Sequence, residues 1–200
     1  MQEGNISGSG DRRQSRAAKL RRLHTKVRGC TACELHKNRQ QAVPGEGPLA
    51  APLMLVGEAP GAREDATGRP FCGPAGQALD DALGRAGLDR SRLYITSTVK
   101  CRPPGNRNPR RGEARVCCST WLELQLQVIS PDLIMLLGRV PMKAVLGIEE
   151  TLRDVHGQLR RRGGREYMLS YHPAAALRFR EAAWRSREDF GEAKRVLEDG

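Results

Sequence analysis

The sequence predicts an α/β protein: a single-domain three-layer αβα sandwich with a central, mainly parallel four-stranded sheet. Short apolar runs, typical of buried strands, alternate along the chain with longer segments whose apolar residues recur at helical spacing. Such alternation favours parallel strands covered by helices on both faces. The chain has 200 residues, of which 38% are hydrophobic, which suffices for one domain with a proper core.

Each element is predicted from an apolar pattern and from the residues that end it. The predicted strands are 53–57, 92–99, 132–138 and 166–173. The predicted helices are 16–27, 75–86 (ending at Gly87, as helices often do), 111–130, 139–147 and 181–197. Residues 1–15 contain little apolar material, so we expect a disordered basic N-terminal tail before a domain of residues 16–200.

The charge balance is strongly basic. The formal net charge is +11 and the sequence pI is about 10.0, which favours an acidic partner, nucleic acid first, although a generally Arg-rich proteome is the plain alternative. No apolar run approaches the roughly 18 residues of a membrane span, and the N-terminus is polar, so we expect a cytoplasmic protein. The basic residues form three clusters: Arg12, Arg13, Arg16, Lys19, Arg21, Arg22, Lys26 and Arg28; Lys100, Arg102, Arg107, Arg110, Arg111 and Arg115; and Arg160, Arg161, Arg162, Arg165, Arg178 and Arg180.

Three unusual segments start at the predicted carboxyl ends of strands, where parallel sheets bind their ligands. They are GEAPGAREDATGRPFCGPAG (57–76), STVKCRPPGNRNP (97–109) and HPAAALR (172–178). The first lacks both GK[ST] and GxGxxG, so it is not an ordinary phosphate loop. Its glycines would let backbone approach a ligand closely, and Glu58 would point towards that ligand. We therefore expect one site built from all three segments.

Six cysteines suggest a metal site. In a cytosolic protein such a set is more typical of metal binding than of disulfides. Cys30-x2-Cys33 is a two-ligand clip, and the other ligands would come from far along the chain. Four thiolates suit zinc or an iron–sulfur cluster, and spacing alone does not decide between them. Buried cysteines without metal are a third interpretation.

The ordered motifs resemble the family 4 uracil-DNA glycosylases, which carry an iron–sulfur cluster. The resemblance covers nearly the whole chain from Cys30 onward. It depends on residues 57–76, on VKCRPPGNRNP (99–109) downstream of CTAC, on SPDLIMLLG (130–138) and on HPAAALR (172–178). It implies a nucleoid-associated, prokaryote-like DNA repair enzyme that acts on DNA containing uracil or another deaminated base.

The resemblance also implies a four-iron four-sulfur (4Fe-4S) cluster. Its ligands would be Cys30, Cys33, Cys101 and one of the pair Cys117 and Cys118, with Cys117 favoured by spacing. The cluster would be structural and would take no part in breaking the glycosidic bond. Cys72 stands where the family has a small apolar residue and is interpreted as packing.

A glycosylase must take its target nucleotide out of the helix into a pocket. By the resemblance, Phe71 would stack on the base, and His172 would donate a hydrogen bond to uracil O2 and stabilise the leaving group. Glu58 would position water or support the positively charged sugar, and backbone of Gly57 and Ala59 would contact the base. Glu64 and Asp65 are ambiguous, because pairing with Arg69 or capping a turn explains them as well as catalysis does.

The HPAAALR segment would enter the minor groove. Leu177 would fill the space that the base leaves, and Arg178 would lie near phosphate. Arg102, Arg107 and the basic N-terminal helix would add phosphate affinity that is independent of sequence. No lysine is suitably placed for a lyase step, so we expect a monofunctional enzyme, and nothing demands more than a monomer.

The sequence departs from the family at Ser97. The family has an asparagine there that reads the uracil edge, and a serine hydroxyl makes fewer hydrogen bonds. Weaker uracil binding, a preference for another deaminated base such as hypoxanthine, and a degenerate member that binds DNA without cleavage all remain open. A zinc-bound nucleic-acid scaffold is a further alternative.

Overall fold

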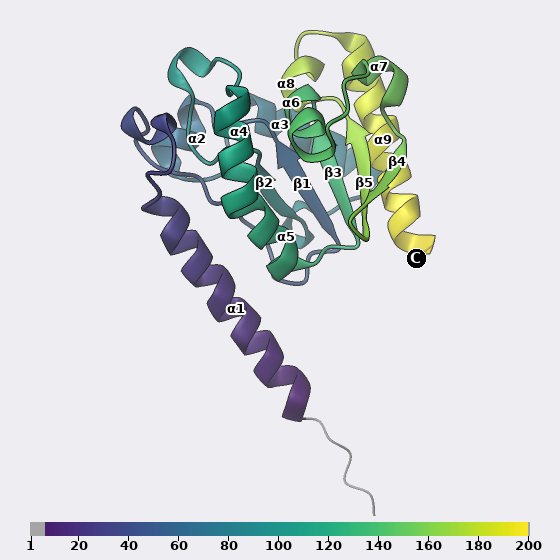
Figure 1. Cartoon of the computed structure of the whole chain (residues 1–200). Helices are drawn as coiled ribbons and strands as arrows, with labels where there is room; N and C mark the ends of the chain where they lie inside the picture. The colour runs from purple at the N-terminus through teal and green to yellow at the C-terminus, as the bar shows by residue number, and fades with distance from the viewer. Residues whose placement is uncertain (1–6, 200) are drawn as a thin grey trace, which may run out of the picture.

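The fold is the predicted three-layer sandwich. The computed structural model describes residues 7–199, and Figure 1 shows a central sheet with helices on both sides. The strand order is β2-β1-β3-β5-β4, in which β4 is antiparallel to β5 and every other pair is parallel. The prediction of four strands missed β4, whose residues LRRR are exposed or half-buried at the edge of the sheet and show no apolar run.

The elements follow the predicted alternation. The strands are β1 (Leu53–Gly57), β2 (Tyr94–Ser97), β3 (Leu133–Leu137), β4 (Leu159–Arg162) and β5 (Arg165–Ser170). The α-helices are α1 (Ser7–Arg28), α2 (Ala62–Thr67), α3 (Pro74–Ala86), α4 (Arg111–Cys117), α5 (Glu123–Ile129), α6 (Arg139–Pro141), α7 (Leu152–Val155), α8 (Pro173–Ala176) and α9 (Arg180–Asp199). The shorter turns are η1 (Glu34–Lys37), η2 (Arg90–Arg92), η3 (Pro104–Asn106), η4 (Cys118–Leu122) and η5 (Met142–Leu146), of which η4 and η5 are π-helical.

Alternate residues of β1 face two separate cores, because side chains alternate across a strand. Leu53 and Leu55 pack with α3 and α9, in a core that includes Leu79 and Phe190. Met54 and Val56 pack on the other face, against α1 and α5. All five residues of β1 are buried, as a strand in the middle of a parallel sheet should be.

Helix α1 begins at Ser7 rather than at Arg16, so part of the predicted tail is helical; residues 1–6 lie outside the described residues. The helix is fixed to the domain by Arg16, whose guanidinium donates to the carbonyls of Val128 (2.8 and 3.0 Å) and Ile129 (2.8 Å) at the end of α5. These carbonyls have no partner within α5, so the arginine completes the helix end.

A buried polar network holds the end of β2. Gln125 donates to Pro44 O (2.6 Å) and to Tyr94 Oη (3.0 Å), and Thr96 Oγ1 donates to Pro44 O (2.9 Å). The fully buried Lys100 donates to Thr96 Oγ1 and to Ser97 O, both at 2.6 Å. Because a buried polar group without a partner costs about 1–3 kcal/mol, this network fixes the backbone that presents Ser97.

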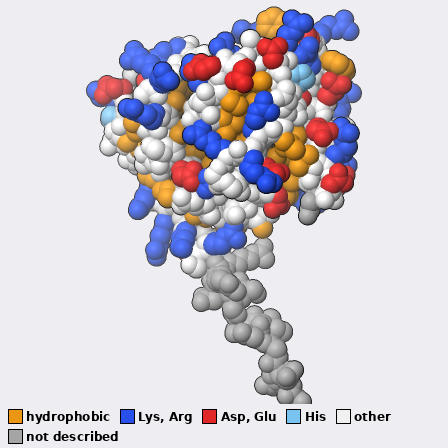
Figure 2. All heavy atoms as spheres, turned by 45° about the vertical axis from the view of Figure 1, so that its right-hand side comes forward, with side chains coloured by type: hydrophobic (Ala, Val, Ile, Leu, Met, Phe, Trp, Pro, Cys, Tyr) orange, Lys and Arg blue, Asp and Glu red, His pale blue; other side chains and the backbone are white. Residues whose placement is uncertain are grey.

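Members of two basic clusters, Arg107 and Arg178, line one cavity. Figure 2 shows Lys and Arg side chains spread over the visible face with acidic side chains between them. Arg161 pairs with Glu166, and Arg165 pairs with Glu123. Arg160, Arg161 and Arg162 lie on the edge strand β4 and Arg165 begins β5, and these two pairs neutralise part of their charge. No helix within residues 7–199 is long and apolar enough to cross a bilayer.

Candidate active site

A cavity of about 520 Å³ opens at the carboxyl ends of the parallel strands. Its size falls in the usual range for ligand pockets. The three segments predicted to converge all line it, as expected for ligand sites of parallel sheets. The predicted site residues in its lining are Glu58, Ala59, Phe71, Ser97, Arg107, His172 and Arg178.

The wall of the cavity depends on contact between Phe71 and Gly57, the last residue of β1. A Cβ atom on Gly57 would lie 2.6 Å from Phe71 Cζ, so only glycine admits the ring at this place. Phe71 has a positive φ of 48°, an unusual conformation for a bulky residue. The ring is 8% exposed and belongs to the core shared with α3 and α9. Phe71 is thus both core and cavity wall.

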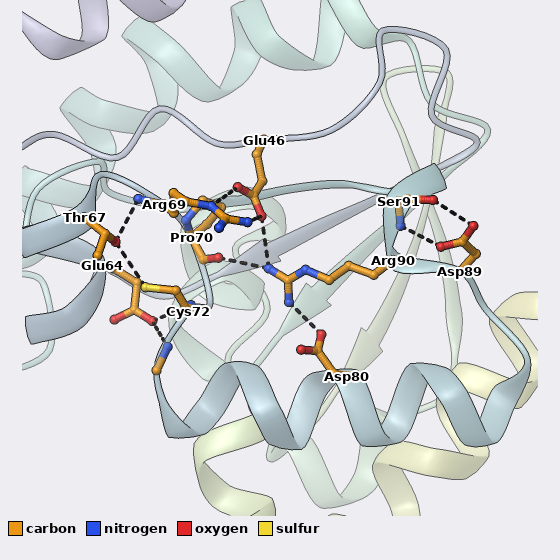
Figure 3. Close-up of polar contacts among 11 residues, drawn as sticks. Glu46, Glu64, Thr67, Arg69, Pro70, Cys72, Asp80, Asp89, Arg90 and Ser91 are labelled. Carbon is orange, nitrogen blue, oxygen red and sulfur yellow. Dashed lines mark hydrogen bonds and ion pairs between the residues drawn. The ribbon is translucent and has the colours of Figure 1, made fainter.

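The loop that carries Phe71 is held by the carboxylate of Glu64. It accepts hydrogen bonds from the backbone N–H groups of Gly61 (3.1 Å), Cys72 (3.0 Å) and Gly73 (2.9 Å); Figure 3 shows Glu64 beside Cys72. Gly76 of α3 lets this loop pack closely, because a Cβ there would lie 1.9 Å from Phe71 O. Of the interpretations that the sequence left open for Glu64, the structure therefore favours capping of a turn.

Arg90 fixes the same loop from the other side, as Figure 3 shows. Its guanidinium donates to Pro70 O (3.0 Å), to Asp80 (2.7 Å) and to Glu46 (3.2 Å). Glu46 also pairs with Arg69 at 3.1 Å, so the partner of Arg69 is neither of the motif acids. These bonds restrain the residues directly before Phe71.

Asp65 also proves structural. It is 1% exposed, and its Oδ1 accepts from the backbone N–H groups of Gln40 (3.0 Å) and Gln41 (3.4 Å). These bonds join α2 to the loop that follows η1. Asp65 does not line the cavity.

His172 faces the cavity as a neutral ring. Its Nδ1 accepts a hydrogen bond from the backbone N–H of Ala174 at 3.1 Å, which caps α8, so Nδ1 carries no proton and Nε2 carries one. Burial lowers the pKa of His172 to about 4, although Glu64 opposes that shift. The His172 and Phe71 rings lie with centroids 5.7 Å apart. The site therefore offers an N–H donor beside an aromatic surface.

Glu58 is a partly buried carboxyl group on the cavity wall. Burial raises its pKa above the ordinary value, and no charged neighbour within the described residues offsets the shift. Its backbone oxygen accepts from Val99 N–H at 3.2 Å, which ties the residue to the segment after β2. A raised pKa makes the ionised carboxylate a better proton acceptor than an exposed one.

Ser97 ends β2 in register with Gly57 and is 5% exposed at the cavity. Its side chain reaches the same wall as Phe71, since its Oγ lies 3.6 Å from where a Cβ on Gly57 would be. Where the sequence analysis expected an asparagine, Ser97 presents a single hydroxyl to the cavity.

The predicted DNA-contacting residues differ in their surroundings. Leu177 is 56% exposed, does not line the cavity, and lies directly after α8. Arg178 is exposed and lines the cavity. Arg107 also lines it, but Glu113 holds its guanidinium in two bonds of 2.7 and 2.9 Å. Arg102 donates to Asn106 at 2.7 Å and lies outside the cavity lining.

The cysteines gather beside this region. Cys101 and Cys117 are buried in one apolar cluster, against which Cys33 packs. Among the described residues three N–H groups donate to these sulfurs: Arg39 Nη1 to Cys101 Sγ at 2.9 Å, Trp121 Nε1 to Cys30 Sγ at 3.2 Å, and the backbone N–H of Ala32 to Cys30 Sγ at 3.4 Å. Cys118 packs instead against the core with α1 and α5, and Cys72 Sγ contacts Thr67 Oγ1.

Burial raises the pKa of the Cys117 thiol to about 12, so the free thiol is protonated and binding of a metal would release its proton. Within residues 7–199, no three His, Cys, Asp or Glu side chains form a group that could hold a metal ion. The donor chemistry nonetheless fits a cluster, because hydrogen bonds to the sulfurs are typical of iron–sulfur sites.

Known proteins resemble this chain over most of its length. The Uracil DNA glycosylase superfamily matches residues 44–198. The type-4 uracil-DNA glycosylase of Pyrobaculum aerophilum is 46% identical over 169 residues, covering 80% of this chain and 85% of the relative. That of Thermotoga maritima is 39% identical over 176 residues, covering 86% and 91%. A type-5 uracil-DNA glycosylase of Pyrobaculum aerophilum is 38% identical over 149 residues, covering 66% and 65%.

The chain therefore belongs to the uracil-DNA glycosylase superfamily. The type-4 relatives confirm the resemblance to family 4 that the motifs indicated.

Sequence reasoning missed two kinds of residue at this site. Arg90 and Glu46 restrain the Phe71 loop through contacts that no local pattern announces. Phe179 lines the cavity although it lies one residue beyond the HPAAALR motif (172–178). The sequence did contain a signal for Phe179, because an aromatic residue between two arginines, Arg178 and Arg180, is unusual at a buried position.

Gly57→Ala should displace the Phe71 ring, because the new methyl group would lie 2.6 Å from it. We expect uracil release to fall at least about tenfold, as misplacement at a reacting centre costs roughly that or more. The control is Gly84→Ala in α3, where a Cβ meets nothing within 4 Å; it should keep full activity. Wild-type release by Gly57→Ala would contradict this account of the cavity wall.

Protonation of Glu58 should cause the fall in the rate of uracil release at acidic pH, which is the acid limb of the pH–rate profile. As pH falls, Glu58 gains its proton first because its pKa is raised, whereas His172 stays neutral until about pH 4. Activity should therefore decline through an apparent pKa above the ordinary glutamate value of 4.5. Initial rates from pH 4 to 9 would measure it, with circular dichroism to verify folding. Glu58→Gln should be slow and lack this limb, and a limb unchanged in Glu58→Gln would refute the assignment.

Proposed function

We propose that this protein is a monofunctional uracil-DNA glycosylase that hydrolyses the N-glycosidic bond between uracil and deoxyribose, leaving an abasic site. The observation that carries the proposal is the neutral His172, whose Nε2–H has no hydrogen-bond partner among the described residues and lies beside the Phe71 ring in a cavity able to take a base. Family membership and the type-4 relatives support the same activity.

Recognition would begin with a uracil nucleotide turned out of the helix. The base would lie against the Phe71 ring, with backbone of Gly57 and Ala59 along the cavity wall. Ser97 would offer its hydroxyl to the base edge. This arrangement excludes water from the base and holds uracil O2 towards His172.

Bond cleavage would place negative charge on uracil and positive charge on the sugar. As the C1′–N1 bond breaks, its electron pair passes to uracil, and His172 Nε2–H donates to O2 to stabilise the anion. Glu58 supports the positive sugar and accepts a proton from the water that attacks C1′. One such donor contributes about 10²- to 10³-fold in rate.

DNA would bind along the mouth of this cavity. Leu177 would occupy the vacated position in the stack, and Arg178 would meet a neighbouring phosphate. Arg102 and Arg107 would add affinity that falls with salt, the latter less because Glu113 neutralises it. Nothing in this scheme needs a second subunit, so we propose that the monomer acts alone.

Cys30, Cys33, Cys101 and Cys117 would hold a 4Fe-4S cluster. The placement of Cys117 beside Cys101, with Cys118 in another core, supports Cys117 as the fourth ligand. Such a cluster would brace the loop between β2 and α4 against α1. Arg39 and Trp121 would donate to its sulfur ligands.

The second candidate function is a glycosylase whose pocket prefers another deaminated base (a retuned pocket), and Ser97 favours it. A hydroxyl reads fewer atoms than an amide, so discrimination between uracil, cytosine and hypoxanthine would weaken or shift. A protein that binds DNA without cleaving it is the more distant version of the same idea. Glu58, Phe71 and His172 stand against it, because their arrangement is suited to catalysis.

The test is release of uracil from labelled single-stranded and duplex oligonucleotides, followed by alkaline cleavage of abasic sites. The anaerobically prepared wild type should release uracil, and His172→Ala should lose about 10²- to 10³-fold of the rate. Ser97→Asn should be faster by up to about 10²-fold, the rate equivalent of a hydrogen bond worth roughly 1–3 kcal/mol.

Ser97→Ala is the matched control, and it should be no faster than the wild type. Breaks at hypoxanthine but not at uracil in the wild type would favour the retuned pocket. No release of any base by the wild type or by Ser97→Asn would contradict the enzymatic proposal. Iron and sulfide analysis of the same preparation would separate a 4Fe-4S cluster from zinc.

A further inference from the structure

We propose that Phe179 is a further DNA-contacting residue, which stacks on the base next to the extruded nucleotide. The inference rests on the proposed function and deepens it, because it assigns a separate residue to the strand that flanks the cavity. Leu177 would fill the empty position in the stack, whereas Phe179 would hold the neighbouring base outside the cavity.

Exposure first distinguishes Phe179 from other apolar side chains. Within the described part of the chain, the exposed large hydrophobic residues are Leu124, Leu159, Leu177, Phe179 and Trp184. Phe179 is 63% exposed, the largest value of the five, and of these five it alone lines the site cavity. An aromatic ring open to water at the mouth of a base-sized cavity is a surface on which a base can stack.

The ring is presented from a fixed backbone. Phe179 lies between α8 and α9; its N–H donates to Ala175 O at 2.9 Å, and its carbonyl accepts from Ala183 N–H at 3.1 Å. Both helices therefore restrain the residue. Little backbone freedom remains to be lost when a base binds, which favours affinity.

The surrounding charge favours nucleic acid over a protein partner. Arg178 and Arg180 flank Phe179 in sequence, and both are exposed. The next residue, Glu181, already pairs with Arg185. A ring between two cations suits a strand in which bases and phosphates alternate, and stacking tolerates any base because each has a π face. Continuity with the cavity places that strand beside the extruded nucleotide.

The test measures DNA binding and local stacking without cleavage. Single-stranded and duplex oligonucleotides would carry a stable abasic analogue, with 2-aminopurine on its 5′ or 3′ side. Fluorescence anisotropy gives affinity, and 2-aminopurine emission reports stacking. The variants are Phe179→Ala, Phe179→Trp and, as a matched control, Trp184→Ala, since Trp184 is 57% exposed but does not line the cavity.

Phe179→Ala should weaken binding on the order of tenfold and raise 2-aminopurine emission on one side of the abasic analogue. Phe179→Trp should keep both properties near wild type, and Trp184→Ala should change neither. Wild-type affinity and emission in Phe179→Ala would overturn the inference. Equal weakening by Trp184→Ala would do so as well, because it would indicate a general surface effect.

Uracil release by the same wild-type preparation separates this inference from the proposed function. A protein that stacks DNA through Phe179 yet releases no base would overturn the glycosylase proposal and support the stacking residue. If the wild type releases uracil and Phe179→Ala binds DNA with wild-type affinity, the glycosylase proposal is supported and the stacking role of Phe179 is overturned.

Discussion

The contact between Gly57 and Phe71 is the constraint on which the site depends. Strand β1 ends in a residue without a side chain, and the Phe71 ring occupies the space that a Cβ would fill. The same ring belongs to the core with α3 and α9, so packing energy of the domain holds the cavity wall in place. The strained φ of Phe71 is maintained by its loop, which Glu64 and Arg90 restrain.

The chemistry proposed for the site follows from burial. Partial burial lowers the pKa of His172 to about 4, so the ring is neutral near pH 7, and the hydrogen bond from Ala174 N–H to Nδ1 leaves Nε2 as the donor. The unfolded chain binds a proton at His172 below about pH 6.5, whereas the folded chain resists it until about pH 4. This residue therefore makes the free energy of unfolding smaller as pH falls through that window. A neutral donor suits this reaction, because its N–H stabilises the anionic leaving group by a hydrogen bond without placing a second positive charge near the positive sugar.

Local patterns predicted most of the sheet and the convergence of the three segments. Strand β1 was predicted at its observed bounds because four apolar residues are followed by glycine. Helix α3 was predicted to within one residue, at 75–86, because its apolar residues recur at helical spacing before Gly87. Strand β4 could not be found this way, since an exposed edge strand rich in arginine has no apolar signal. The cap made by Glu64 and the bonds of Arg90 to Pro70 arise only when distant segments meet. The resemblance of the motifs to family 4 indicated the candidate roles. Tertiary contacts were needed to identify the tautomer of His172 and the restraints on the Phe71 loop.

The protonation of His172 is the central claim, and nitrogen-15 NMR of the imidazole measures it directly. Protein labelled at histidine ring nitrogens would be compared with His172→Gln to assign the resonances, from pH 8 to pH 5. We predict a protonated Nε2 and an unprotonated Nδ1 throughout this range, because His172 titrates only near pH 4. An imidazolium at pH 6, or a proton on Nδ1, would contradict it, because His172 would then not be the neutral Nε2–H donor on which the proposed chemistry depends.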